Sequence, residues 1–160
     1  MASLTSAATE LRQIVENYQK AFTTITEAEL SAKPRPEKWS RKEVIGHLID
    51  SAQNNLRRFI CGQYEESPPH IIYAQDFWVE AAQYNRMEAL EIIHLWKLIN
   101  ERICAVLEKM PPEKYSRLCN TGQDEPSLHS IEWLAIDYVV HLKHHINQII
   151  PGSFDVRYPQ

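Results

Sequence analysis

The sequence lacks the features that mark three common classes of protein. Its three cysteines, Cys61, Cys104 and Cys119, are widely spaced, which fits neither a paired zinc motif nor a disulfide framework. A net charge of -4 without a local basic cluster disfavours nucleic-acid binding. No apolar run approaches the roughly 18 residues of a membrane span, and the N-terminal stretch has no apolar signal region. We therefore expect a reduced, cytoplasmic protein that is neither exported nor inserted in a membrane.

Period-two alternation is also missing, whereas helical periodicity is strong in four segments. A chain of 160 residues has the size of a single domain, which we expect to span residues 1–160. The sequence thus predicts an all-α fold, a four-helix bundle. The expected helices run over residues 5–24, from Ser40 to Phe59 or Ile60, from about Asn85 to the prolines at 111–112, and from about Leu128 to residues 151–152.

Local signals locate two of the helix starts. Ser40 and Glu43 have the spacing of a capping box, in which each side chain accepts a hydrogen bond from the other residue's backbone N–H, and Trp39 lies just before this cap. Asn85 and Glu88 have the same spacing and predict a similar start for the third helix.

The links between the expected helices are longer than the two to eight residues that are usual in bundles. The first link predicts a short helical turn at residues 26–30. The second, from Cys61 to Tyr84, contains "YAQDFWVEAAQY", which can form a short helix of its own. Its "QDFW" is a candidate cover for a cleft, but docking of the crossover onto the bundle explains it equally well. The third link, over residues 111–127, looks irregular.

Histidines on the second and fourth helices carry the functional signal. His141 and His145 are four residues apart, so their imidazoles lie one above the other on the inward face of the fourth helix, as in the H-E-x-x-H helices of zinc enzymes. His144 lies on the far side of His141 and faces inward less than they do. His47 lies on the second helix at the border between an apolar stripe and a polar one that includes Ser51, Asn55 and Arg58. This position makes it the candidate third ligand.

The three histidines can meet only if the second and fourth helices are antiparallel. His47 lies about 10 Å from the start of its helix and His145 about 8 Å from the end of its own, so the levels then agree. A plain up-down-up-down bundle makes these helices parallel. The histidines therefore predict an up-down-down-up path, with the long segment from Cys61 to Tyr84 as the crossover between the second and third helices.

Three stretches, "PRPEKWSRKEVIGHLID", "YAQDFWVEAAQYN" and "IEWLAIDYVVHLKHHINQI", resemble the DinB/YfiT family of four-helix metalloproteins. The resemblance implies the bundle with the crossover, and His47, His141 and His145 as ligands of a divalent ion, commonly zinc or nickel. It also implies a frequent homodimer, and thiol S-transferase or related isomerase chemistry with low-molecular-weight thiols such as bacillithiol, mycothiol or glutathione.

Two classes of function follow as expectations. In the first, the ion activates a bound thiol or water, giving a thiol S-transferase or a metal-dependent hydrolase that acts on a small molecule. No catalytic residue beyond the ligands is identified. In the second, the bundle is non-catalytic and binds a metal or small molecule, acting through dimerisation.

Each candidate residue also has a structural alternative. His141 and His145 could instead be partly buried residues that hydrogen-bond to backbone or water. We assign His144, and likewise His70, His94 and His129, to surface or packing roles. The Asp137 carboxylate could orient the His141 ring by accepting a hydrogen bond from it, but a solvated acid on the helix face is the favoured interpretation.

Overall fold

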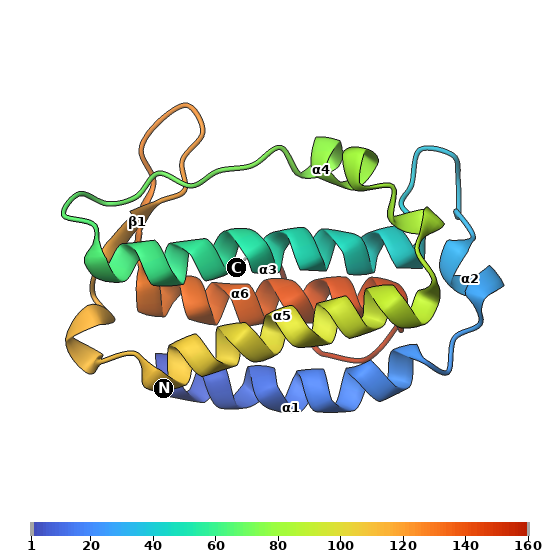
Figure 1. Cartoon of the computed structure of the whole chain (residues 1–160), viewed down its shortest axis with the longest axis horizontal. Helices are drawn as coiled ribbons and strands as arrows, with labels where there is room; N and C mark the ends of the chain where they lie inside the picture. Colours follow the sequence, from blue (N-terminus) through green and yellow to red (C-terminus); the bar gives the residue numbers. More distant parts are fainter. Residues whose placement is uncertain (1, 160) are drawn as a thin grey trace.

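The computed structural model describes residues 2–159; Met1 and Gln160, which the expected domain included, lie outside this range. It has four long helices, two short ones, two 3-10 turns and a two-stranded hairpin (Figure 1). The elements are α1 (Leu4–Phe22), α2 (Glu27–Ser31), α3 (Arg41–Tyr64), α4 (Gln75–Ala82), η1 (Tyr84–Arg86), α5 (Ala89–Lys109), η2 (Pro112–Lys114), β1 (Leu118–Asn120), β2 (Leu128–Ser130) and α6 (Ile131–Ile149).

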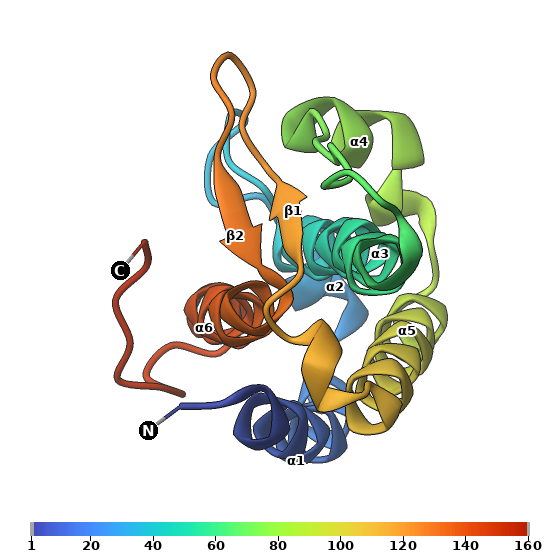
Figure 2. The same cartoon turned by 90° about the vertical axis from the view of Figure 1, so that its left-hand side faces the viewer.

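The helix directions confirm the predicted bundle and its crossover. In Figure 1, α1 and α6 run one way while α3 and α5 run the other, so the path is up-down-down-up. The link from α3 to α5 returns along the length of the bundle, and α4 lies on it, outside α3 (Figure 2). As a result α3 and α6 are antiparallel neighbours, and each also packs against one of the other two long helices.

A continuous apolar core fills the space between the four long helices. Phe22 at the end of α1 and Trp96 of α5 are fully buried in it, with ring centroids 5.1 Å apart. Removing such aromatic side chains from water is the main source of stability in a bundle of this kind. No helix in residues 2–159 combines the length and apolar character that a membrane span requires.

The start of α3 forms as predicted. The Ser40 hydroxyl accepts from the Glu43 backbone N–H at 3.0 Å, and the Glu43 carboxylate accepts from the Ser40 backbone N–H at 3.0 Å. One turn further on, the Tyr84 ring packs so closely against Gly46 that a Cβ there would lie 2.0 Å from Cδ2 of the ring. These contacts fix the first two turns of the helix, on which His47 lies.

Three details of the sequence prediction need correction. Residues 128–130 pair with residues 118–120 in an antiparallel hairpin, so α6 begins at Ile131 rather than near Leu128. The Asn85–Glu88 capping box does not form, because the Asn85 amide contacts Ser40 and Glu43 instead. Helix α3 continues to Tyr64, beyond the expected end at Phe59 or Ile60, since Gly62 lets it pack against the hairpin at Cys119.

Candidate metal centre

The three predicted histidines meet at the interface between α3 and α6. His47 lies in the second turn of α3, and His141 and His145 lie on successive turns of α6. One ring nitrogen from each residue lies within 4.8 Å of the other two. The Nε2 atoms of His47 and His141 are 3.2 Å apart, and the His145 ring centroid is 4.6 Å from that of His47 and 4.4 Å from that of His141.

Burial keeps these imidazoles neutral. His47 is 1% exposed, and removal from water lowers its pKa to about 3, with a smaller contribution from His145. Burial likewise holds the pKa of His141 well below its usual value, and that of His145 below it, although the Gln148 hydrogen bond opposes the shift at His145. A neutral imidazole has a free lone pair, which is the form that binds a metal.

Within residues 2–159, only His145 is oriented by a hydrogen bond to a residue outside the three histidines. The Gln148 amide oxygen accepts from Nδ1 of His145 at 2.8 Å, which leaves the Nε2 lone pair of His145 free. The Nδ1 atoms of His47 and His141 are buried and have no partner within residues 2–159, while their Nε2 atoms face each other. The three converging ring nitrogens each offer a lone pair. A proton shared between the Nε2 atoms of His47 and His141 would be bonded by only one of these lone pairs, whereas a cation between the three rings would be bonded by all three. The donor set therefore fits a divalent ion that favours imidazole, such as zinc or nickel.

None of the four remaining histidines contributes a nitrogen to this cluster, although the His144 ring packs against that of His145 with centroids 4.9 Å apart. His70 contacts the Gly122 carbonyl oxygen at 2.6 Å, His129 stacks on Trp133 with centroids 3.9 Å apart, and His94 is exposed. His144 follows His141 on α6 but is not part of the group of converging nitrogens.

Asp137 has neither of the two roles considered for it. Its Oδ2 accepts from the Tyr158 hydroxyl at 3.4 Å, and His141 Nδ1 lacks a partner, so Asp137 does not orient the His141 ring. The carboxyl is partly buried rather than solvated, and that burial raises its pKa.

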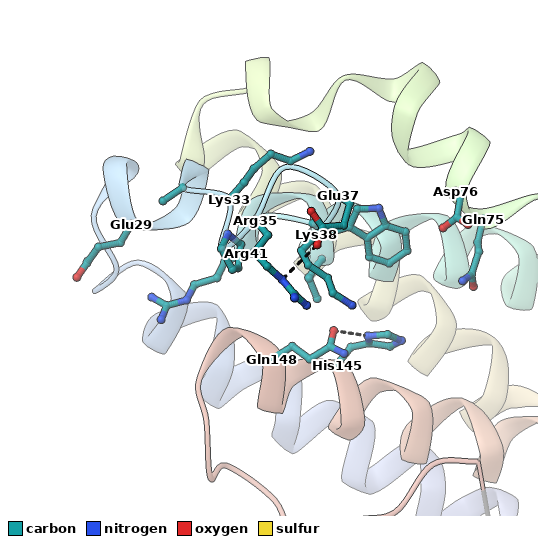
Figure 3. Close-up of a pocket in the computed structure, with 14 residues that line it drawn as sticks. Glu29, Lys33, Arg35, Glu37, Lys38, Arg41, Gln75, Asp76, His145 and Gln148 are labelled. Carbon is teal, nitrogen blue, oxygen red and sulfur yellow. Dashed lines mark hydrogen bonds and ion pairs between the residues drawn. The ribbon is translucent and has the colours of Figure 1, made fainter.

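A cavity of about 930 Å³ opens on one side of the histidines (Figure 3). His145 and Gln148 of α6 face it from below, and the loop before α3 covers it with basic side chains, including Lys38. The predicted cover "QDFW" contributes Gln75 and Asp76 to the lining. The site is thus accessible from solvent on the His145 side.

A second cavity, of about 630 Å³, also adjoins the histidines of α6. Its lining includes His141, His144 and His145 from α6, and Ser51, Asn55 and Arg58 from the polar border of α3. Two cavities therefore adjoin one group of histidines. A cluster that only filled space in the core would adjoin neither.

Sequence reasoning missed two residues that hold the histidines. The Trp39 ring packs on His47 with centroids 4.9 Å apart, although the sequence assigned it only to the helix start. Gln148 orients His145, and its position three residues later on the same helix face was the available signal.

Comparison with known proteins agrees with this geometry. The family model described as DinB superfamily matches residues 10–149. The "Putative metal-dependent hydrolase YfiT" of Bacillus subtilis (strain 168) is 24% identical over 139 residues, 87% of this chain and 78% of that protein. The "Putative metal-dependent hydrolase OB0782" of Oceanobacillus iheyensis is 26% identical over 141 residues, 88% of this chain and 80% of that protein.

Solved structures show the same fold. The structure of Bacillus subtilis YfiT, described as having "an unusual four-helix bundle topology", superposes with a TM-score of 0.69 at 26% identity, covering 91% of this chain and 79% of that one. A mycothiol-dependent maleylpyruvate isomerase superposes with a TM-score of 0.67 at 16% identity, over 89% of this chain but only 59% of its own. With the family model matching most of its length, this chain belongs to the DinB superfamily.

Proposed function

We propose that His47, His141 and His145 hold one divalent ion, zinc or nickel, and that the protein is a metal-dependent enzyme acting on a small molecule. The observation that carries this proposal is the convergence of three neutral imidazole nitrogens within 4.8 Å of one another, next to two cavities. The names of the relatives, metal-dependent hydrolases, support the class of enzyme.

The ion would act as a Lewis acid that lowers the pKa of a thiol or water bound to it, which makes a nucleophile at neutral pH. The chain's own residues prepare the site for this role. Burial keeps the three rings unprotonated, Gln148 sets the tautomer of His145, and Trp39 covers the His47 ring on one side. The cavity beside His145 gives a substrate access.

Thiol transfer and hydrolysis both fit this arrangement. Thiol S-transferase chemistry is the first choice, supported by the resemblance of the sequence motifs and by the fold shared with a mycothiol-dependent enzyme. The same site with water as the nucleophile gives a hydrolase. The proposal includes a cytoplasmic location, because low-molecular-weight thiols stay reduced in the cytoplasm.

The test compares metal-free protein with protein reloaded with Zn²⁺ or Ni²⁺. Each is assayed with several cellular thiols and a chromogenic electrophile, and separately with chromogenic esters without thiol. We expect metal-dependent transfer that is lost in His47→Ala. If the loaded protein hydrolyses esters but transfers no thiol, hydrolysis is the reaction instead. A metal-loaded protein that is inert towards all these substrates would overturn the enzyme proposal.

A non-catalytic bundle that acts through dimerisation is the second candidate. Leu90, Leu95 and Leu98 of α5 are all exposed, at 70%, 40% and 43%, and apolar side chains on one helix can form a subunit interface. Light scattering of the purified protein tests the homodimer. A monomer at micromolar concentration would contradict this candidate while leaving the enzyme proposal intact.

A further inference from the structure

Arg58 is an unusual cation for the interior of a bundle. Its side chain is 9% exposed, and it takes part in none of the ion pairs formed within residues 2–159. The other buried cation among these residues, Lys42, pairs with the Glu27 carboxylate. A buried charge without a partner is costly, so an arginine kept in this position calls for a reason.

The hydrogen bonds of Arg58 supply only part of that reason. Nε and Nη2 donate to the Ile71 carbonyl oxygen at 3.1 and 2.6 Å, which ties the crossover to α3, and Nη1 donates to the Asn55 amide oxygen at 3.2 Å. A guanidinium has five N–H groups. These three bonds leave one N–H on each of the two terminal nitrogens, and a pair of N–H groups on neighbouring nitrogens matches the two oxygens of a carboxylate.

Arg58 adjoins the second cavity. Arg58 lines this cavity together with Ser51 and Asn55 from its own helix, and with His141 and His145 from α6. The Asn55 amide donates to the Ser51 carbonyl oxygen at 2.9 Å, so it is held in place while its oxygen fixes Nη1 of Arg58. The arginine is therefore positioned by its neighbours rather than free to turn towards solvent.

The spacing along α3 allows one ligand to contact both Arg58 and the histidines. Arg58 follows His47 by eleven residues, about 16 Å along the helix axis. Its side chain leans back towards His47, because Nη1 bonds to Asn55 one turn earlier. An acid several carbons long can thus place its carboxylate at Arg58 and its other end at the histidines.

We propose that Arg58, with Asn55 and Ser51 behind it, forms a subsite for a carboxylate group of a ligand whose other end lies at His141 and His145. The inference deepens the proposed function, on which it rests, by naming an organic acid as the substrate class. The carboxylate belongs either to the thiol or to its electrophilic partner. Asp137 also lines this cavity and weakens the attraction, since it carries the same sign of charge as the ligand.

Binding to metal-free protein tests the subsite separately from the metal. The probe is 3-phenylpropionate, and its neutral counterpart 3-phenylpropanamide has the same shape without the charge. We expect NMR titration of protein stripped with chelator to show binding of the acid about tenfold or more tighter than that of the amide, the range of a hydrogen bond to a charged group. Equal binding of acid and amide would overturn the subsite.

Arg58→Met removes the donors at similar length, and Arg57→Met is its matched control, because Arg57 is the adjacent residue on the exposed face. We expect Arg58→Met to lose the preference for the acid and Arg57→Met to keep it, with metal content unchanged in both. Arg58→Lys retains the charge and a folded core if Arg58→Met proves unstable, and a single ammonium should keep only part of the preference. Undiminished preference in both Arg58 variants would overturn the proposal.

Competition identifies which reactant carries the acid. Displacement of 3-phenylpropionate by glutathione but not by its diethyl ester assigns the subsite to the thiol. Displacement by neither supports the electrophile as its owner, and displacement by both contradicts recognition of a carboxylate. A protein that binds the acid through Arg58 but takes up no metal would retain this inference and lose the proposed function.

Discussion

Helix α6 takes part in two buried polar clusters that lie within one turn of each other, and they differ in how their polar atoms are used. Tyr138 donates its hydroxyl to the Asn100 amide oxygen, and the Asn100 amide donates to the Trp96 carbonyl oxygen at 2.8 Å. One turn later, His141 faces His47 with nitrogen against nitrogen, and both of these rings have a second nitrogen without a partner. In the first cluster the Asn100 and Tyr138 side chains are both hydrogen-bonded, although the buried Trp96 indole N–H has no partner within residues 2–159. The second cluster leaves one nitrogen unpartnered on each of two facing rings.

The two clusters differ less in their access to the cavities. Asn100 is 0% and Tyr138 2% exposed, and Asn100 lines neither cavity beside the histidines, whereas Tyr138 lines the second one. His145 lines both of those cavities. Buried polar side chains that bond to each other hold a fold together, and those left with lone pairs next to a cavity are candidates for binding. The difference supports the proposal that the histidines, rather than the Asn100–Tyr138 pair, form the site.

The largest expected effect is stabilisation by metal. An ion that binds only the folded state at 1,000 times its dissociation constant should raise the free energy of unfolding by about 4.1 kcal/mol. Urea denaturation with and without Zn²⁺ or Ni²⁺ measures this difference. The gain should vanish in His145→Ala and be unaffected in Asn100→Leu; an equal gain in His145→Ala would mean that the ion binds elsewhere.

Breaking the hydrogen bond between Tyr138 and Asn100 should cost stability without affecting metal binding. Asn100→Leu leaves the buried Tyr138 hydroxyl without an acceptor, which should lower the free energy of unfolding by about 2 kcal/mol. Adding Tyr138→Phe removes the orphaned hydroxyl, so the double variant should recover much of the loss. Urea denaturation at fixed pH checks both, and a double variant less stable than the single one would contradict this role.

Acid should destabilise the metal-free protein through its buried histidines. Unfolded histidine takes up a proton below about pH 6.5, whereas folded His47, with a pKa of about 3, does not. Stability therefore falls as the pH decreases from about 6.5 towards 3, by up to about 1.4 kcal/mol per pH unit for His47.

Replacing the ring isolates this contribution. His47→Phe should flatten the pH dependence of the unfolding free energy, because the variant no longer takes up that proton on unfolding. His94→Gln, on the exposed face of α5, is the matched control and should keep the wild-type slope. Identical slopes in wild type and His47→Phe would show that burial does not keep His47 neutral.

The smallest effect concerns the helix start that positions His47. Ser40→Ala removes the cap of α3 and should lower the free energy of unfolding by about 1 kcal/mol. Because the core still holds the helix, metal affinity should stay within about twofold of wild type. A large loss of affinity would mean that the cap itself sets the geometry of the site.

Sequence reasoning reached the helices of the bundle because their signals are local. Helical periodicity located the long helices, and the Ser40–Glu43 spacing predicted the start of α3. The topology needed one assumed contact between distant residues, that of His47 with the i, i+4 pair on α6. This contact requires α3 and α6 to be antiparallel, and the antiparallel requirement then led to the crossover.

The features that were missed depend on such contacts. Strands of three residues are too short for their alternation to be recognised, so the hairpin before α6 was expected to be irregular. Asn85 has the spacing of a helix cap, but its amide oxygen accepts a hydrogen bond from the hydroxyl of Ser40, which is far away in the sequence. Arg58 was assigned to the polar border of α3, and its burial follows from the Ile71 carbonyl of the crossover, which no local pattern predicts.

The metal content of purified protein is the most direct measurement of all. Protein prepared without chelators should contain about one zinc or nickel ion per chain when it is analysed by inductively coupled plasma mass spectrometry. His141→Ala should lose the ion, and His144→Ala, the matched change of a neighbouring histidine outside the cluster, should retain it. Wild-type protein without stoichiometric metal, or equal content in His141→Ala and His144→Ala, would contradict a metal centre formed by His47, His141 and His145.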